Sequence, residues 1–346
     1  MRNKMKFFTP MAVALVLALL SLVACTSNEE PTYTPALAET PVTPDAPSPT
    51  DPTPDAGDAN DSAPTDIPED ATAATRTIIT PQGDSIVLPA EIQSIVTLGP
   101  SVAEILVELG FAAYITATDS FSAGIPGLGA DVPRSFGIMD PDPEYLLNLM
   151  PDVVFIAGAS RDPLAPLEAA GIPVIYIATA NTIGDIYNDI RFIANIMDVG
   201  QAGADLVAHM EYTIDTIREL TPGGEGPTVY FEVSPAPWMF SFGNGTFLNE
   251  MLEILNAQNI FAGEEGWIPV TDEAVILANP DIILTSTDFL EDPIQEILDR
   301  PGFDAVNAVV YGRVHQVDAD ASSRPSQNIL DALWEMAVFI HPDIFS

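Results

Sequence analysis

The stretch SIVTLGPSVAEILVELGFAAYITAT (94–118) decides the fold class. It opens with a short apolar strand that a Gly-Pro pair breaks. Ser101 and Glu104 have the spacing of a capping box, which predicts a helix running to Gly110. The segment AAYITAT (112–118) then predicts a second strand. A strand, a helix and a strand in so few residues form a βαβ unit, which indicates a parallel sheet and an α/β fold.

The same alternation recurs along the rest of the chain. Further apolar strands are predicted at DVVFIAG (152–158), PVIYIA (173–178), TVYFEVS (228–234), DIILTS (281–286) and RVHQVDA (313–319). Residues 182–220 between the two groups have helical periodicity, with a weak point at 200–203. The sequence therefore predicts two parallel-sheet α/β lobes, residues 76–200 and 221–346, joined by one long α-helix, residues 201–220.

Composition excludes several classes of function. The 346 residues contain 11 Lys and Arg against 50 Asp and Glu, a formal net charge of −39, which repels nucleic acid. The 47% of hydrophobic residues supports a folded body. One cysteine forms no internal disulfide or thiolate cluster, and the three histidines lack ligand spacing, so no metal site and no catalytic residues are predicted.

The N-terminus has the layout of a secretory signal. Basic residues precede an apolar run that ends in LVAC (22–25), which resembles the bacterial lipobox. We therefore expect residues 1–24 to be a signal peptide and Cys25 to be lipidated, anchoring the protein to the cell membrane on its extracytoplasmic side. The alternative is a short transmembrane anchor with an incidental cysteine.

Residues 25–75 form the predicted tether. The segment after Cys25 contains ten prolines, many Thr, Ala and Asp residues, and one aromatic, Tyr33. Such a composition buries too little apolar surface to offset its ordering entropy, so we expect disorder. The tether would let an anchored body move above the membrane, although a glycosylated wall spacer would have a similar effect.

An internal repeat marks both lobes. EYLLNLMPD (144–152) and EAVILANPD (273–281) share a glutamate, apolar positions, and a Pro-Asp pair before an apolar strand. Residues just before each copy have cap character, so Glu144 and Glu273 are expected near helix N-termini, where negative charge is favourable. Helix-start chemistry alone would explain both glutamates.

Several motifs in order resemble the iron-siderophore/cobalamin family of ABC-transporter substrate-binding lipoproteins. They are SIVTLGPSVAEILVELG (94–110), the two glutamate-to-Pro-Asp segments, GWIPVTDEAVILANPDIIL (266–284), and AVVYGRVHQVD (308–318) before a last helix that ends at residues 341–342. The resemblance covers residues 76–346. It implies a periplasmic-binding-protein-like fold, with two lobes bridged by a long helix and a ligand cleft between them.

The resemblance also implies partners and roles. Glu144 and Glu273 match the glutamates that meet arginines of the membrane permease. The partners would be that permease with its ATPase, and a small metal chelate, either a ferric siderophore or a corrinoid such as cobalamin. We expect no enzyme activity, no intrinsic cofactor and a monomer.

Aromatic residues are the first ligand-binding candidates. Trp267 lies six residues before Glu273, a spacing similar to that of a ligand-facing tryptophan in cobalamin-binding members. Trp238 and Phe242 lie in the loop after one predicted strand, and Phe121 follows another. Aromatic walls suit a broad or macrocyclic ligand. Each of these side chains could instead belong to the core.

Arginines are the second group. Arg134, Arg161 and Arg324 lie in segments predicted as loops that face the cleft. Arginine binds ligand carboxylates or catecholates through planar paired hydrogen bonds. The alternative is a surface arginine that balances local acid.

Two other functions stay open at this point. Haem or another organic metal complex could replace the siderophore as the ligand. A surface or sensory lipoprotein without a transport role could also use the same fold.

Overall fold

The computed structural model describes residues 74–81, 83–134 and 136–345. The predicted signal peptide, Cys25 and all but the last two residues of the predicted tether lie outside the described residues. Within the described part of the chain, no helix is both long and apolar enough to cross a membrane.

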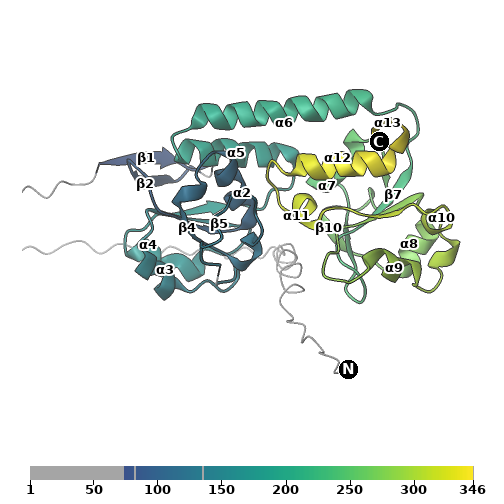
Figure 1. The fold of residues 1–346 in the computed structure, drawn as a ribbon, viewed down its shortest axis with the longest axis horizontal. Helices are drawn as coiled ribbons and strands as arrows, with labels where there is room; N and C mark the ends of the chain where they lie inside the picture. Colours follow the sequence, from purple (N-terminus) through teal and green to yellow (C-terminus); the bar gives the residue numbers. More distant parts are fainter. Residues whose placement is uncertain (1–73, 82, 135, 346) are drawn as a thin grey trace, which may run out of the picture.

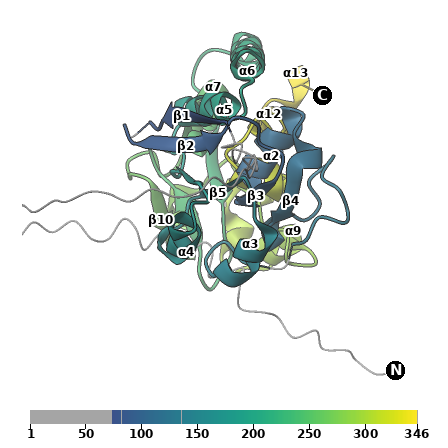
Figure 2. The ribbon, with the colours of Figure 1, turned by 90° about the vertical axis from the view of Figure 1, so that its left-hand side faces the viewer.

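Residues 75–196 form an α/β lobe. Its elements are β1 (Thr75–Ile79), β2 (Ser85–Pro89), β3 (Ile95–Leu98), α2 (Pro100–Glu108), η1 (Ala112–Tyr114), β4 (Ile115–Thr118), η2 (Ser120–Ser122), α3 (Pro143–Leu149), β5 (Val153–Ala157), η3 (Asp162–Leu164), α4 (Ala165–Ala169), β6 (Val174–Ile177) and α5 (Ile183–Ile196). The order β4-β3-β5-β6 makes one parallel sheet, and β1 and β2 form an antiparallel hairpin. Figure 2 shows this lobe from its outer end, with α3 and α4 below the sheet and α5 above it.

Residues 228–345 form a lobe of the same class. Its elements are β7 (Thr228–Glu232), β8 (Phe240–Phe242), α7 (Phe247–Ile254), β9 (Gln258–Asn259), β10 (Trp267–Pro269), α8 (Asp272–Ala278), β11 (Ile282–Thr285), α9 (Pro293–Leu298), η4 (Phe303–Ala305), α10 (Asn307–Val310), β12 (Val314–Gln316), α11 (Ala319–Ser323), α12 (Ile329–Ile340) and α13 (Pro342–Phe345). The parallel order is β12-β11-β7-β9, while β8 and β10 pair antiparallel. The α/β class with parallel sheets is therefore confirmed.

The helix after β3 starts differently from the prediction. It begins at Pro100, with Gly99 as its N-cap and no capping side chain. Proline is preorganised for a first helical turn. Ser101 is therefore already inside the helix, and the predicted capping box is wrong. The Glu104 carboxylate instead binds groups of the second lobe.

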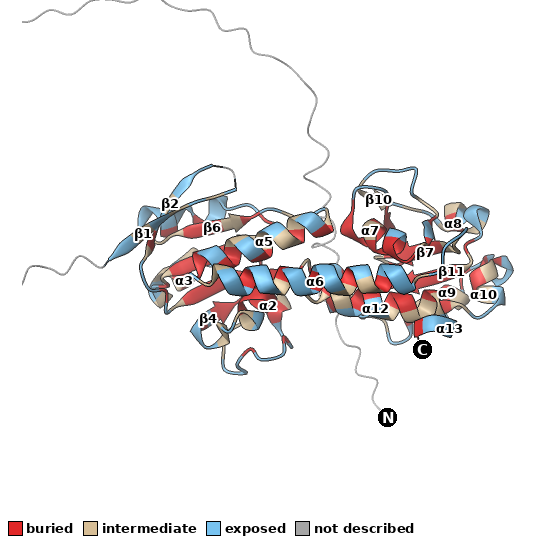
Figure 3. Cartoon of the chain, turned by 90° about the horizontal axis from the view of Figure 1, so that it is seen from above, coloured by how far each residue is buried: buried red, intermediate tan, exposed pale blue. Residues whose placement is uncertain are grey.

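A 21-residue helix, α6 (Gly200–Leu220), joins the lobes. It lies along one side of the whole molecule, over α5 in one lobe and over α7 and α12 in the other (Figures 1 and 3). The break before it falls at residues 197–199, where Asp198 has a positive φ, slightly before the predicted weak point. A Cβ at Gly203 would lie 2.3 Å from that of Ala194, so α6 packs closely on α5.

The central core runs through both lobes. One cluster of buried apolar side chains includes Ile105 and Ile186 from the first lobe, Met210 of α6, and Leu252 and Leu333 from the second. Two smaller clusters each lie within one lobe. In Figure 3, buried residues alternate with exposed ones along α5, α6 and α12. The lobes are therefore one packed body along the α6 side.

Asp189 of α5 gives a test of this packing by pH. Burial raises the pKa of its carboxyl to about 7, and the charge of Asp185 adds to the rise. A raised native pKa favours the protonated form, so its contribution to stability is fully present below about pH 4 and is lost progressively between about pH 4 and 7. Asp189→Asn should therefore match the wild type near pH 4 and exceed it at pH 8 by up to about 4 kcal/mol.

Calorimetric unfolding at about pH 4, 6 and 8 measures this difference. The exposed Asp205 of α6 supplies the control variant Asp205→Asn, which should show no comparable trend. A difference between Asp189→Asn and wild type that stays constant across the three pH values would contradict the assignment.

Candidate functional site

The sequence repeat forms two equivalent helices. α3 and α8 each have seven residues, lie in different lobes (Figure 1), and end in a left-handed residue, Met150 or Asn279. Asp142 caps α3 by accepting from the Tyr145 amide at 3.0 Å. Thr271 caps α8 in the same way, accepting from the Ala274 amide at 3.3 Å.

The Pro-Asp pairs join strands within each sheet. The Asp152 carboxylate accepts from the Gln93 and Ser94 amides at 2.8 and 2.9 Å, at the start of β3. The Asp281 carboxylate accepts from the Thr228 amide and hydroxyl at 3.0 and 2.9 Å, at the start of β7. Each aspartate thus fixes its helix–strand turn to the neighbouring strand.

Glu144 and Glu273 occupy the same position on the two helices, and both side chains are exposed. Capping is performed by Asp142 and Thr271, so neither glutamate is needed as the cap. A hydrogen bond from its own backbone amide, with one from Thr271, lowers the pKa of Glu273. The two helices thus present one exposed anion from each lobe.

Aromatic side chains follow the carboxyl ends of several parallel strands. Trp238 follows β7 and is 59% exposed, and Phe289 follows the adjacent β11 and is 44% exposed. Phe121 follows β4 in the first lobe and is half-buried. Parallel strands bring such loops to one edge of a sheet. The rule that selected Trp238 and Phe121 from the sequence also applies to Phe289, which was missed.

Trp267 and Phe242 pack together in the second lobe. Phe242, expected at the ligand surface, is fully buried between Phe231 and Trp267, at ring-centroid distances of 5.4 and 6.0 Å. Its ring lies in the core because β8 pairs with β10 and directs this side chain inward. Trp267 is half-buried and also contacts Phe247. Phe242 therefore packs against the buried side of the Trp267 ring.

The three candidate arginines have different surroundings. Arg161 is half-exposed and pairs with Glu168. Arg134 donates to the carbonyls of Gly129, Ala130 and Val132, and so closes its own loop. Arg324 is buried, with protein groups around its guanidinium. Of the three, Arg161 is the most accessible to a ligand.

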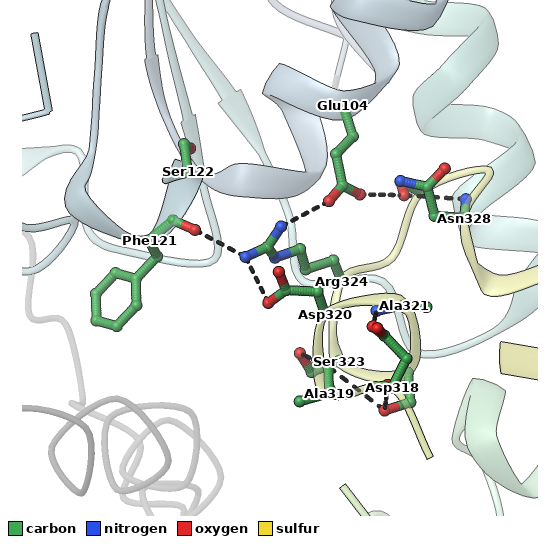
Figure 4. Close-up of polar contacts among 12 residues, drawn as sticks. Glu104, Phe121, Ser122, Asp318, Ala319, Asp320, Ala321, Ser323, Arg324 and Asn328 are labelled. Carbon is green, nitrogen blue, oxygen red and sulfur yellow. Dashed lines mark hydrogen bonds and ion pairs between the residues drawn. The ribbon is translucent and has the colours of Figure 1, made fainter. Parts of the chain in front are cut away.

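Arg324 binds the first lobe from the second. Its guanidinium donates to the Glu104 carboxylate and to the Phe121 carbonyl, both at 2.8 Å (Figure 4). The loop after β4 therefore meets the segment after β12, so the carboxyl edges of the two sheets face each other at this point. The pair was missed because its partners lie 220 residues apart in sequence.

An open groove of about 420 Å³ lies at the junction of the lobes and α6. It is lined by Ile183, Gly184, Tyr187, Ile214, Arg218, Glu250, Glu253 and Ile254. None of the aromatic or arginine candidates lines this groove. Among the described residues, no group of three or more His, Cys, Asp or Glu side chains could hold a metal ion.

The comparisons agree with this architecture. The sequence model of a family described as periplasmic binding protein matches residues 95–321. An uncharacterized ABC transporter substrate-binding lipoprotein, YvrC, of Bacillus subtilis is 29% identical over 80% of this chain and 91% of its own. A cobalamin-binding protein of Halobacterium salinarum is 25% identical, over 74% and 72% respectively.

A solved structure is also similar. The protein, described as a possible iron-binding (periplasmic solute-binding) protein from Staphylococcus epidermidis, is 30% identical, with a TM-score of 0.65. The alignment covers 72% of this chain and 99% of that protein.

The aspartates and the glutamates of the repeat should contribute differently to stability, which unfolding measurements can test. Asp152→Ala and Asp281→Ala should each lower the free energy of unfolding by about 1–3 kcal/mol, because backbone amides lose their partners. Glu144→Ala and Glu273→Ala should leave the unfolding temperature nearly unchanged, because both side chains are exposed. Denaturant unfolding of the four variants measures this. Equal losses in all four would indicate that the glutamates only stabilise their helices.

Proposed function

The chain belongs to the periplasmic binding protein family, and we propose that it captures a metal chelate outside the cell membrane and delivers it to an ABC importer. The observation that carries this proposal is that the loop after β4 in the first lobe contacts the segment after β12 in the second, while one bridging helix packs on both lobes. Its relative in Bacillus subtilis, named as an ABC transporter substrate-binding lipoprotein, supports the same role. The proposed role is binding, without catalysis.

We propose that the ligand contacts Trp238, Trp267 and Phe121, with Phe289 as a further contact and Arg161 as a polar one. Aromatic faces bind broad organic ligands with little demand for hydrogen bonding. The iron chelates and corrinoids expected from the sequence differ in charge. We propose a corrinoid first, because a relative is named as a cobalamin-binding protein. In addition, only one of the three candidate arginines, Arg161, is accessible, which leaves little positive charge to bind an anionic iron chelate.

Glu144 and Glu273 are proposed to dock the permease. Each exposed ion pair contributes only about 0.2–1 kcal/mol. Two anions at a fixed separation therefore add little affinity for the permease and act mainly by steering and orienting the protein on it. Lipidation of Cys25 would anchor the protein to the membrane, where the permease lies. The lipoprotein name of the relative in Bacillus subtilis supports that anchor.

Tryptophan fluorescence tests the ligand assignment. Cobalamin, haem and ferric siderophores absorb where tryptophan emits, so the ligand should quench saturably, and we expect cobalamin to do so. Trp238→Ala and Trp267→Ala should each weaken binding by about tenfold, because each removes apolar contact area. Trp334 on α12, half-exposed against Phe345, is the control, and Trp334→Phe should bind normally. Absence of quenching by every ligand would contradict the proposed ligand class.

Charge reversal tests docking. The double variant Glu144→Arg/Glu273→Arg should abolish uptake of the chelate by cells while its affinity for the chelate stays unchanged, because exposed charges leave the ligand site intact. The matched control Asp205→Arg/Glu219→Arg reverses two exposed carboxylates on α6 and should transport normally. Loss of uptake in both double variants would assign the effect to net charge, and lost ligand affinity would assign the glutamates a structural role.

A further inference from the structure

Arg324 makes contacts in two lobes at once. Within its own lobe it pairs with Asp320 at 2.5 Å, one turn back along the chain. Across the lobes it donates to the Glu104 carboxylate and to the Phe121 carbonyl. Figure 4 shows the guanidinium lying between these three acceptors. It is therefore bound on both sides of the junction.

Glu104 is held by more than the arginine. Its second carboxylate oxygen accepts from the Ser326 hydroxyl at 2.5 Å, and its backbone carbonyl accepts from the Gln327 amide group at 3.3 Å. The segment between α11 and α12 thus contacts α2 through three side chains. Burial raises the pKa of the Glu104 carboxyl, while the hydrogen bonds from Arg324 and Ser326 oppose that rise.

The backbone of Phe121 is hydrogen-bonded by residues of both lobes. Asp119, fully buried, accepts from the Phe121 amide at 2.8 Å, from the Ser122 hydroxyl at 2.8 Å and from the Gly99 amide at 3.0 Å. These contacts lie within the first lobe. The Phe121 carbonyl is bound by Arg324 of the second lobe, so the position of this loop depends on where the second lobe lies.

A second contact crosses the junction near α6. The Glu250 carboxylate of α7 accepts from the Ile183 amide at the start of α5, at 2.7 Å. Both residues line the open groove. If the lobes rotated about α6, this hydrogen bond would report the change, since its two groups belong to different lobes.

A second buried arginine–glutamate pair, comparable to Arg324 and Glu104, lies within one lobe. Arg300 binds the Glu232 carboxylate through both terminal nitrogens, at 2.6 and 3.1 Å. Its side chain and that of Glu232 are 4% and 1% exposed, close to the 10% and 3% of Arg324 and Glu104. The two pairs have similar chemistry and burial, and differ in whether they join the lobes.

We infer that the Glu104–Arg324 pair, with Ser326, is a latch that fixes the relative orientation of the two lobes and the position of the Phe121 loop. Arg324 is a positioning residue in this arrangement, because its donors are bound by protein groups. The inference does not depend on the identity of the ligand or on the transport role.

Hydrogen exchange measured by mass spectrometry on the full chain tests the latch. Arg324→Lys keeps the charge but lacks the planar guanidinium that donates to two acceptors at once, so it should weaken the contacts with Glu104 and Phe121 that join the lobes. We expect exchange in residues 119–125 and 180–186 to become at least about tenfold faster, because the Phe121 loop and the Ile183 amide lose their fixed partners. The α3 amides at 144–149, which belong to one lobe, should exchange as in the wild type.

Arg300→Lys is the control. It should speed exchange around β7 and α9 and leave residues 119–125 and 180–186 unchanged. The inference is overturned if Arg324→Lys leaves these two segments unchanged, or if both variants speed exchange in them equally. Should Arg324→Lys fail to fold, Ser326→Ala removes one hydrogen bond to Glu104, along with the local one from the Asn328 amide, and should speed exchange in the same two segments by a smaller factor. No change there would likewise overturn the latch.

Discussion

The close packing of α6 on both lobes is the constraint on which the rest of the structure depends. Gly203 brings α6 against α5 at a distance that no side chain would allow. The same helix contributes Met210 to the core cluster that continues into α7 and α12. Because a close-packed core deforms little, the two sheets keep a fixed separation on this side. Relative motion of the lobes is therefore a rotation about α6, which changes the Glu250–Ile183 contact beside this helix as well as the Arg324 contacts.

The repeat shows how this rigidity reaches the two exposed glutamates. Each Pro-Asp pair ties its helix to the neighbouring strand, so α3 and α8 move with their sheets. Helix-start chemistry and docking are then compatible explanations, since Asp142 and Thr271 perform the capping while Glu144 and Glu273 stay exposed. Two anions carried on one packed body have a defined spacing, which is what a partner with two fixed cations could recognise.

Much of the fold could be predicted because its determinants are local. Continuous apolar runs bounded by Gly, Pro and Asp predicted the parallel strands, and the repeat located α3 and α8. The capping box at Ser101 failed because the helix begins at Pro100, two residues before the position that a Ser101 cap requires, and because Arg324 of the other lobe binds Glu104. No local pattern predicts a pair such as Glu104 and Arg324. The position of Phe242 was also unpredictable, since whether a loop aromatic faces inward depends on a strand pairing that the sequence does not display.

The placement of the arginines bears on the charge of the ligand. The structure describes eight arginines, and several of them serve the fold. Arg76 and Arg313 donate to the last carbonyls of α5 and α12, Arg134 closes its loop, and Arg300 and Arg324 form buried pairs. Arg191 and Arg218 form exposed pairs near α6. In a chain of net charge −39, little positive charge then remains near the loops that follow the strands. A strongly anionic chelate would meet repulsion there, which supports the proposal of a ligand of low or positive charge.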